Sequence, residues 1–326
     1  MIISRAPFRV SFCGGGSDIP SFYEKYTGCV LSTTIRKYVY IAINKAFNND
    51  SITLKYSQTE VVNDASQIQH RIFKQVLTDF GTKGLEITSM ADIPAGTGLG
   101  SSSSFTVALL KALYAYNSKS TSAYKVAKEA CDIEINQLGN PIGKQDQFAA
   151  AFGGLRYYEF ERDGFVKVEP IIMSKASRDH LESSMMLFYT GALHDANKIL
   201  GEETKNLATA NEKINATKTL CEMTKELKAS LESNDVDAIG PILKRGWEIK
   251  KSLASGITSP LINHYYELGI NAGATGGKLL GAGGGGFLLF FAPDAEKRVQ
   301  IREALHELKE MPFELEQSGV SMIYTE

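Results

Sequence analysis

Residues 94–104 read Pro-Ala-Gly-Thr-Gly-Leu-Gly-Ser-Ser-Ser-Ser, three alternate glycines followed by four serines. It follows the β-rich segment 85–90 and leads into the apolar segment 105–116, so the predicted order is strand, loop, helix. Backbone N–H groups in such a loop can approach an anion closely, and the helix N-terminus adds about half a positive charge. Phosphate is the natural ligand, although an ordinary loop with helix-capping serines has the same composition.

Outward from this loop, strands and helices alternate, and the pattern changes beyond Pro170. The strands expected before that point are at 9–12, 29–44, 51–56, 85–90, 154–160 and 165–168, and the helices at 68–80, 105–116 and 123–138. Those expected after it are strands at 185–189 and 287–291, helices between 196 and 255 and over 295–309, and two short terminal strands. We therefore predict an α+β protein with two domains, 1–172 and 173–326.

The composition excludes several classes of function. With 43% hydrophobic and 22% charged residues, the 326-residue chain is an ordinary globular protein. Its 35 Lys and Arg nearly balance 37 Asp and Glu, which favours a small-molecule partner over nucleic acid or an anionic membrane. The longest apolar run, 287–292, is too short to span a bilayer, and the N-terminus does not resemble a signal peptide, so we expect a soluble, cytoplasmic protein.

The four cysteines are far apart in the sequence and form no C-x-x-C or Cys/His cluster. This spacing argues against a zinc site and against a disulfide framework. We expect free thiols, mostly buried.

A second glycine cluster occupies residues 276–286. Its spacing formally satisfies the dinucleotide-binding G-x-G-x-x-G, but that motif must follow a strand and open a helix, whereas here a helix is expected before it and a strand after it. Lys278 does not complete a phosphate-binding Walker motif either, because the spacing is one residue short and Leu279 follows. The cluster is interpreted as a tight turn that lets the backbone close on a ligand or on the other domain, or as a plain structural turn.

Two acidic residues are candidates for chemistry. Asp146 follows the turn-rich stretch 139–145 at an expected helix start, where it could act as a base or simply cap the helix. Glu134, on the preceding helix, is either functional or a solvated surface charge.

Taken together, these segments resemble the GHMP kinase superfamily, which includes galactokinase, homoserine kinase, mevalonate kinase and several sugar kinases. Its first motif resembles residues 5–18 (RAPFRVSFCGGGSD), its second the loop 94–104, its third residues 276–286, and its catalytic-aspartate region the stretch around Asp146. The resemblance spans nearly the whole chain. It implies an N-terminal ribosomal-protein-like domain and a C-terminal ferredoxin-like domain with the active site in the cleft between them.

Within the superfamily, the stretches RAPFRVSFCGGGSDIPSFYEKY, GKQDQFAAAFGGL and FYTG most resemble bacterial D-glycero-D-manno-heptose 7-phosphate kinases. This implies an ATP-dependent kinase acting on the anomeric hydroxyl of that sugar phosphate, in nucleotide-activated heptose synthesis for surface polysaccharide. L-fucose kinase is the nearest alternative. One departure is His194, where the subfamily usually has an arginine that could hold a substrate phosphate.

The resemblance also implies roles for individual residues, with ATP and Mg²⁺ as cofactors. Asp146 would accept the proton of the sugar hydroxyl and Arg9 would keep it ionised, although Arg9 could instead form a surface salt bridge. Ser102 and Glu134 would hold Mg²⁺. The residues expected to bind the ATP phosphates are Pro94, Gly96, Thr97, Gly98, Leu99, Gly100, Ser101, Ser102 and Ser103. Those expected to contact the sugar or sugar phosphate are Gly14, Gly15, Gly16, Ser17, Asp18, Gly283 and Gly284.

Two other classes compete with a kinase. A dinucleotide-dependent oxidoreductase is disfavoured by the context of the second glycine cluster. A catalytically inactive ligand sensor of the same fold would be expected to have lost the serines, Glu134 or Asp146, all of which are present. The sequence leaves the oligomeric state open, a homodimer included.

Overall fold

Long apolar stretches near the N-terminus form the central strand pair of a large sheet. In this computed structural model, which describes residues 1–47, 51–191 and 196–326, β1 (Ile2–Cys13) pairs antiparallel with β2 (Gly28–Lys45). Phe8, Val10 and Phe12 are buried, since helices cover one face of the sheet and the second domain packs near its end.

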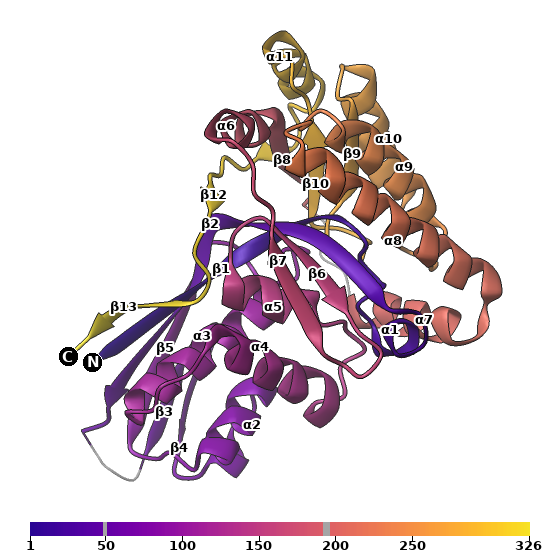
Figure 1. Ribbon diagram of the computed structural model, residues 1–326. Coiled ribbons are helices and arrows are strands. Elements are labelled where there is room, and N and C mark those ends of the chain that lie inside the picture. Colours follow the sequence, from indigo (N-terminus) through magenta and orange to yellow (C-terminus); the bar gives the residue numbers. More distant parts are fainter. Residues whose placement is uncertain (48–50, 192–195) are drawn as a thin grey trace.

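Among the described residues, the sheet has the order β13-β1-β2-β5-β3-β4, and β6 and β12 also pair with β2. The remaining strands are β3 (Ile52–Lys55), β4 (Thr59–Val62), β5 (Leu85–Ala91), β6 (Arg156–Phe160), β7 (Val166–Pro170), β12 (Leu315–Glu316) and β13 (Ser321–Thr325). Figure 1 shows the helices gathered on one face. They are α2 (Arg71–Phe80), α3 (Ser101–Tyr116), α4 (Ala123–Cys131) and α5 (Gln145–Phe152), with α1 (Pro20–Tyr26) at the end of β1. A short 3₁₀-helix, η1, spans Ala65–Gln67.

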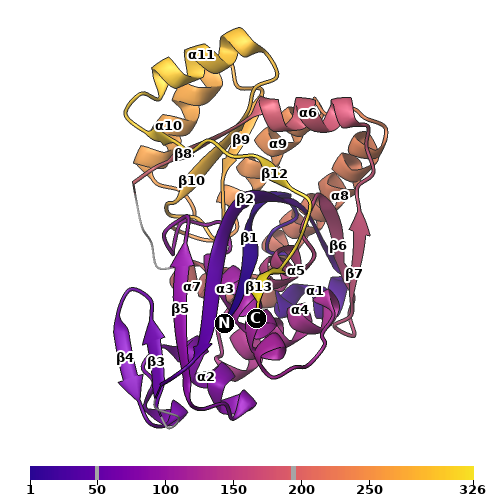
Figure 2. The same ribbon diagram turned by 90° about the vertical axis from the view of Figure 1, so that its left-hand side faces the viewer.

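The second body is built on a smaller antiparallel sheet with the order β11-β8-β10-β9 in the described chain. Its strands are β8 (Met185–Tyr189), β9 (Gly276–Leu279), β10 (Phe287–Phe291) and β11 (Lys309–Glu310), and its helices are α6 (Lys175–Ser184), α7 (Ala196–Thr209), α8 (Asn211–Glu232), α9 (Ile239–Lys251), α10 (Pro260–Asn271) and α11 (Ala295–Ala304). From β8 to β11, the order strand, helices, two strands, helix, strand is that of a ferredoxin-like domain, as predicted. Figure 2 shows this sheet above the large one.

The C-terminal tail departs from the predicted division at residue 172. β12 and β13 leave the second body and pair with β2 and β1, so the two chain termini lie side by side (Figure 1). These strands are short and partly exposed, and their sequences show no strong alternation that would assign them to either sheet.

Two further elements differ from expectation. The single helix predicted over 123–138 ends at Cys131 and continues as a π-helical turn, η2 (Asp132–Gln137). The second glycine cluster lies between helix α10 and strand β10, as expected, but its first residues form strand β9, which was not expected. The cluster is nevertheless unsuited to a dinucleotide, because it joins two antiparallel strands and opens no helix.

The four cysteines are free and buried, as predicted: Cys13, Cys29, Cys131 and Cys221. In the part of the chain that the structure describes, no helix has both the length and the apolarity required to cross a bilayer.

Candidate active site

A cavity of about 320 Å³ lies where the two bodies meet. One wall comes from β1, the loop after it, the loop 96–103 and the start of α5, and the other comes from α7, α8, α9 and β9. The predicted residues that line it are Arg9, Gly14, Gly15, Gly16, Asp18, Gly96, Gly98, Gly100, Ser101, Ser102, Ser103, Asp146 and Gly283. Most of the site expected from the sequence is thus brought to one place.

The loop 94–104 adopts the conformation that its glycines predict. Gly96, Gly98 and Gly100 have φ values of 78°, 82° and 79°, and α3 begins at the next residue, Ser101. A side chain would strain each of these positions, so the alternation of glycines is what allows the backbone to fold in this way. The helix N-terminus faces the cavity and forms a site suited to phosphate.

The two glycine segments touch through their backbones. A β-carbon on Gly281, where φ is 79°, would lie 2.5 Å from the Cα atom of Gly98, and one on Gly98 would lie 2.4 Å from the carbonyl oxygen of Leu280. This contact confirms the interpretation in which the turn of the second glycine cluster, 276–286, closes on the other domain. The turn between β9 and β10 therefore packs directly against the glycine- and serine-rich loop 94–104.

Several predicted contact residues do not line the cavity. Thr97 is buried and donates its hydroxyl to Pro94 O at 3.0 Å, and Leu99 is in the core. Ser17 is fully buried, with its hydroxyl bonded to Gly14 O at 2.7 Å and accepting the Cys29 N–H at 3.0 Å. These residues shape their loops without facing the cavity.

Pro94, Glu134 and Gly284 do not line the cavity either. The Gly284 N–H donates to Ile257 O at 2.9 Å, which holds the turn. His194, the departure from the subfamily pattern, lies outside the described residues.

Arg9 and Asp146 form a bidentate ion pair at the centre of the cavity wall. Arg9 Nε donates to Oδ1 at 2.7 Å and Nη2 to Oδ2 at 3.0 Å, while Nη1 donates to Gly98 O at 2.6 Å. Arg9 is only 4% exposed, so it is no surface salt bridge. Asp146 does not cap α5: the N-cap residue is Lys144, and the Asp146 carboxylate accepts from Arg9 instead. Through these bonds Arg9 connects Asp146 on α5 to Gly98 in the loop 94–104.

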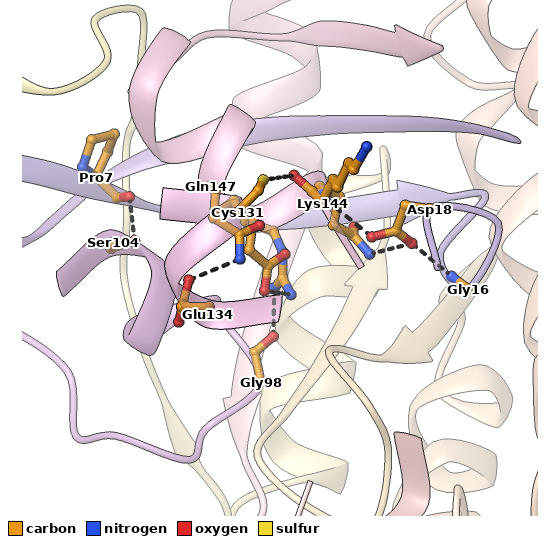
Figure 3. A network of polar contacts seen from close by, with 12 residues as sticks. Pro7, Gly16, Asp18, Gly98, Ser104, Cys131, Glu134, Lys144 and Gln147 are labelled. Carbon is orange, nitrogen blue, oxygen red and sulfur yellow. Dashed lines mark hydrogen bonds and ion pairs between the residues drawn. The ribbon is translucent and has the colours of Figure 1, made fainter. Parts of the chain in front are cut away.

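Glu134 is completely buried, which excludes the solvated surface charge. It accepts the Ser102 hydroxyl at 2.5 Å and the Gln147 side-chain amide at 2.8 Å, and Figure 3 shows that amide directed at it. Burial raises its pKa, and in the described chain no cation forms an ion pair with it. A π-helical turn carries Glu134; such turns are frequent at functional sites, but residue spacing alone gives no sign of one.

Asp18 connects the loop after β1 to the start of α5. It is 2% exposed, accepts the Gly16 N–H at 3.0 Å and the backbone N–H of Gln145 at 3.0 Å, and burial raises its pKa. Figure 3 shows its carboxyl turned toward Gly16. Since both oxygens have donors, Asp18 positions the Gly14–Gly16 loop beside Asp146.

The second domain contributes three charged residues that were not predicted to belong to the site. Lys250 on α9 forms a buried ion pair with Glu203 on α7, with Nζ at 2.7 and 2.9 Å from the two carboxylate oxygens. Lys278 on β9 donates to Phe12 O at 3.3 Å. Lys278 could have been singled out in the sequence, because it is the only charged residue between Glu267 and Asp294.

Comparison with known proteins decides the family. Residues 66–154 match the family described as GHMP kinases N terminal domain, and residues 223–310 match GHMP kinases C terminal. The chain is 32% identical over 317 residues to D-glycero-alpha-D-manno-heptose 7-phosphate kinase of Campylobacter jejuni, with 93% of each chain covered. The chain belongs to the GHMP kinase family. The predicted family and two-domain fold are thereby confirmed, and the protein is a phosphotransferase with an alcohol group as acceptor.

Two other relatives refine this comparison. A crystal structure described as a D-glycero-D-manno-heptose 1-phosphate kinase from Bacteroides thetaiotaomicron has a TM-score of 0.80 and 30% identity, with 100% of both chains covered. The bifunctional fucokinase/GDP-fucose pyrophosphorylase of Arabidopsis thaliana is 27% identical over 92% of this GHMP kinase, which spans 31% of that protein. The protein is a sugar kinase of this family, whose members use ATP.

Proposed function

We propose that this kinase transfers the γ-phosphoryl group of ATP to the anomeric hydroxyl of D-glycero-D-manno-heptose 7-phosphate, which gives the 1,7-bisphosphate. The observation that carries the proposal is the cavity in which the glycine and serine loop faces the Arg9–Asp146 pair. The acceptor is supported by the Campylobacter and Bacteroides relatives, whose names both contain a heptose phosphate.

Ser102 at the start of α3 and Glu134 on η2 fit Mg²⁺. Glu134 is a buried carboxylate whose contacts are a hydroxyl and an amide, and the Ser102 hydroxyl lies 2.5 Å from it. Mg²⁺ prefers oxygen ligands and needs only one or two from protein when phosphates and waters supply the rest. Ser102 and Glu134 would hold the ion, which when bound neutralises charge on the ATP phosphates.

Asp146 is placed to receive the proton of the acceptor hydroxyl. As the bond between that oxygen and the γ-phosphorus forms, the bond from phosphorus to the bridging oxygen breaks and ADP leaves with the electron pair. Arg9 remains charged throughout, so it orients Asp146 and balances negative charge while the aspartate takes the proton. The backbone N–H groups of the loop 96–103 would hold the phosphates in line.

The test is ADP release with Mg²⁺ and ATP across heptose 7-phosphate, unphosphorylated heptose, L-fucose, galactose, mannose, mevalonate and homoserine. We expect kcat/KM for heptose 7-phosphate to exceed that for every other acceptor by at least about tenfold. Identification of the product by ³¹P NMR should show a new anomeric phosphate. Equal or greater turnover of an unphosphorylated sugar would overturn the acceptor assignment.

L-fucose is the second candidate acceptor, because the fucokinase relative matches 92% of this chain. The same panel decides between them: L-fucose carries no phosphate, so a preference for it would assign the cavity to a neutral sugar. An inactive ligand sensor is not favoured, since Asp146, Glu134 and Ser102 are all present and in contact with their partners.

A further inference from the structure

The wall of the cavity that the second domain provides is basic, and within the described part of the chain one of its cations has no carboxylate as an ion-pair partner. Lys250 is neutralised by Glu203, which contacts its ammonium through both oxygens. Lys278 donates only to the carbonyl oxygen of Phe12, and among the described residues no carboxylate forms an ion pair with it. A charge removed from water in this way is costly unless an opposite charge is supplied.

The position of Lys278 separates it from the loop proposed to bind ATP. Its hydrogen-bond partner Phe12 lies three residues beyond Arg9 on β1, which corresponds to about 10 Å along a strand. The pairing of β1 with β2 is irregular between Ser11 and Cys13, and such an irregularity leaves a backbone group free to accept from a side chain. The ammonium therefore lies along the cavity from Asp146, away from the start of α3.

The Lys250–Glu203 pair adjoins the same part of the cavity. A β-carbon on Gly16 would lie 2.3 Å from Glu203 Oε1 and 3.6 Å from Lys250 Nζ, so the pair is packed directly against the Gly14–Gly16 loop. Both lysines line the cavity, and the charge of Lys250 contributes to lowering the pKa of Lys278. Two ammonium groups and one carboxylate leave an excess of positive charge at this end.

We propose that Lys278, with Lys250 beside it, forms an anion-binding subsite that recognises a phosphate group on the acceptor. This rests on the proposed function, because it assumes that the acceptor hydroxyl is held at Asp146. It also specifies which part of this chain supplies a cation for that phosphate. A charge-assisted hydrogen bond in a partly buried site is stronger than one in water, so the subsite would discriminate a phosphorylated acceptor from a neutral one.

The first test compares Lys278→Met with Lys244→Met, an exposed lysine on the same helix as Lys250. For Lys278→Met we expect KM for heptose 7-phosphate to rise by about 10- to 100-fold, while KM for ATP and for unphosphorylated heptose changes by less than about threefold. Lys244→Met should match the wild type. A preserved preference for the phosphorylated acceptor in Lys278→Met overturns the subsite while leaving the proposed function in place.

The second test needs no substrate and separates the two proposals. Lysine acetylation by acetic anhydride, read by mass spectrometry, is measured on the wild type with and without inorganic phosphate at millimolar concentration. We expect phosphate to slow acetylation of Lys278 but not of Lys244. Protection in an enzyme that shows no preference for heptose 7-phosphate would support the subsite and overturn the proposed acceptor, and absence of protection counts against the subsite.

Discussion

Arg9 and Asp146 are 137 positions apart in the chain, yet two parallel hydrogen bonds of 2.7 and 3.0 Å join their side chains. Because the guanidinium cannot give up its proton, the carboxylate is the group of this pair that can accept one. We expect Asp146→Asn to lower kcat by about 10²- to 10⁴-fold, since the variant lacks the proton acceptor. Its affinity for ATP, measured by calorimetry, should stay within about threefold of the wild type.

The matched control for this variant is Asp79→Asn, which changes an exposed carboxylate on α2 far from the cavity. It should leave both kcat and ATP affinity unchanged. Near-normal turnover by Asp146→Asn would remove Asp146 from the proposed mechanism.

The buried Glu134 carboxylate lowers the stability of the folded protein when it is ionised. Because burial raises its pKa, the ionised carboxyl destabilises the fold, and Glu134→Gln removes that penalty. The Gln147 amide oxygen has no hydrogen-bond partner, so this amide can turn over and accept from the new glutamine. We expect the variant to lose at least about 10²-fold in kcat and to gain about 1 kcal/mol in unfolding free energy at neutral pH.

The sign of the pH dependence provides a check on this prediction. The wild type loses stability as the pH rises from the ordinary carboxyl pKa, 4.5, through the raised pKa of Glu134, whereas the variant has no group there to ionise. The difference in Tm between them should therefore be absent below that window and complete above it. A lower Tm for Glu134→Gln at neutral pH would contradict the argument.

The part of the site that could be predicted from sequence is the part whose geometry is local. Gly96, Gly98 and Gly100 alternate because each must take a positive φ, and that requirement is visible in the spacing itself. The placement of Asp146 at a helix start could also be anticipated, because the turn-rich stretch 139–145 directly before it is visible in the sequence. Arg9 and Glu134 acquired roles only through the family resemblance, because no local pattern relates them to the loop.

The basic wall could not be predicted because it depends on how helices of the second domain pack. Glu203 and Lys250 are on different helices, and the pair becomes visible only once α7 and α9 are placed together. The return of β12 and β13 to the first sheet was missed for a similar reason, since short partly exposed strands show little periodicity. Lys278 was a detectable signal that the sequence analysis used only to reject a Walker motif.

The contact between the two glycine loops predicts a large effect from a small substitution. In Gly281→Ala, the new methyl group would meet the Cα atom of Gly98 at 2.5 Å, so the turn must move away from the loop. Gly81→Ala is the matched control, because its φ is also positive, 60°, and no atom lies within 4 Å of the added carbon. Backbone strain should cost each variant about 1 kcal/mol of stability, and Gly281→Ala should lose more because of this contact.

Only Gly281→Ala should affect nucleotide binding, with KM for ATP raised about tenfold or more, since displaced backbone N–H groups lose their alignment with the phosphates. Steady-state kinetics together with thermal melts separates the two effects. An equal change of KM in both glycine variants would mean that strain alone, and not the contact between the loops, determines the outcome.

The proposed subsite makes the use of a phosphorylated acceptor depend on pH. Burial lowers the pKa of the Lys278 ammonium to about 8, and the groups that surround it are Cys13, Lys250, Arg9 and Glu203. Arg9 and Lys250 each form an ion pair, with Asp146 and with Glu203. Burial raises the pKa of the Cys13 thiol, so of Cys13 and Lys278 the lysine is expected to titrate first. The protonated form of Lys278 is the one that would bind phosphate, and the fraction of Lys278 in this form falls as the pH rises through about 8.

We therefore expect kcat/KM for heptose 7-phosphate to be highest near about pH 7, above the pKa of about 6 at which a phosphate monoester becomes dianionic, and to fall to about half by about pH 8. The same profile measured with unphosphorylated heptose should lack the fall. Lys278→Arg keeps its charge at every accessible pH, so in that variant the descending limb should move to higher pH. A fall near pH 8 with both acceptors would assign the titration to another group and remove this support for Lys278.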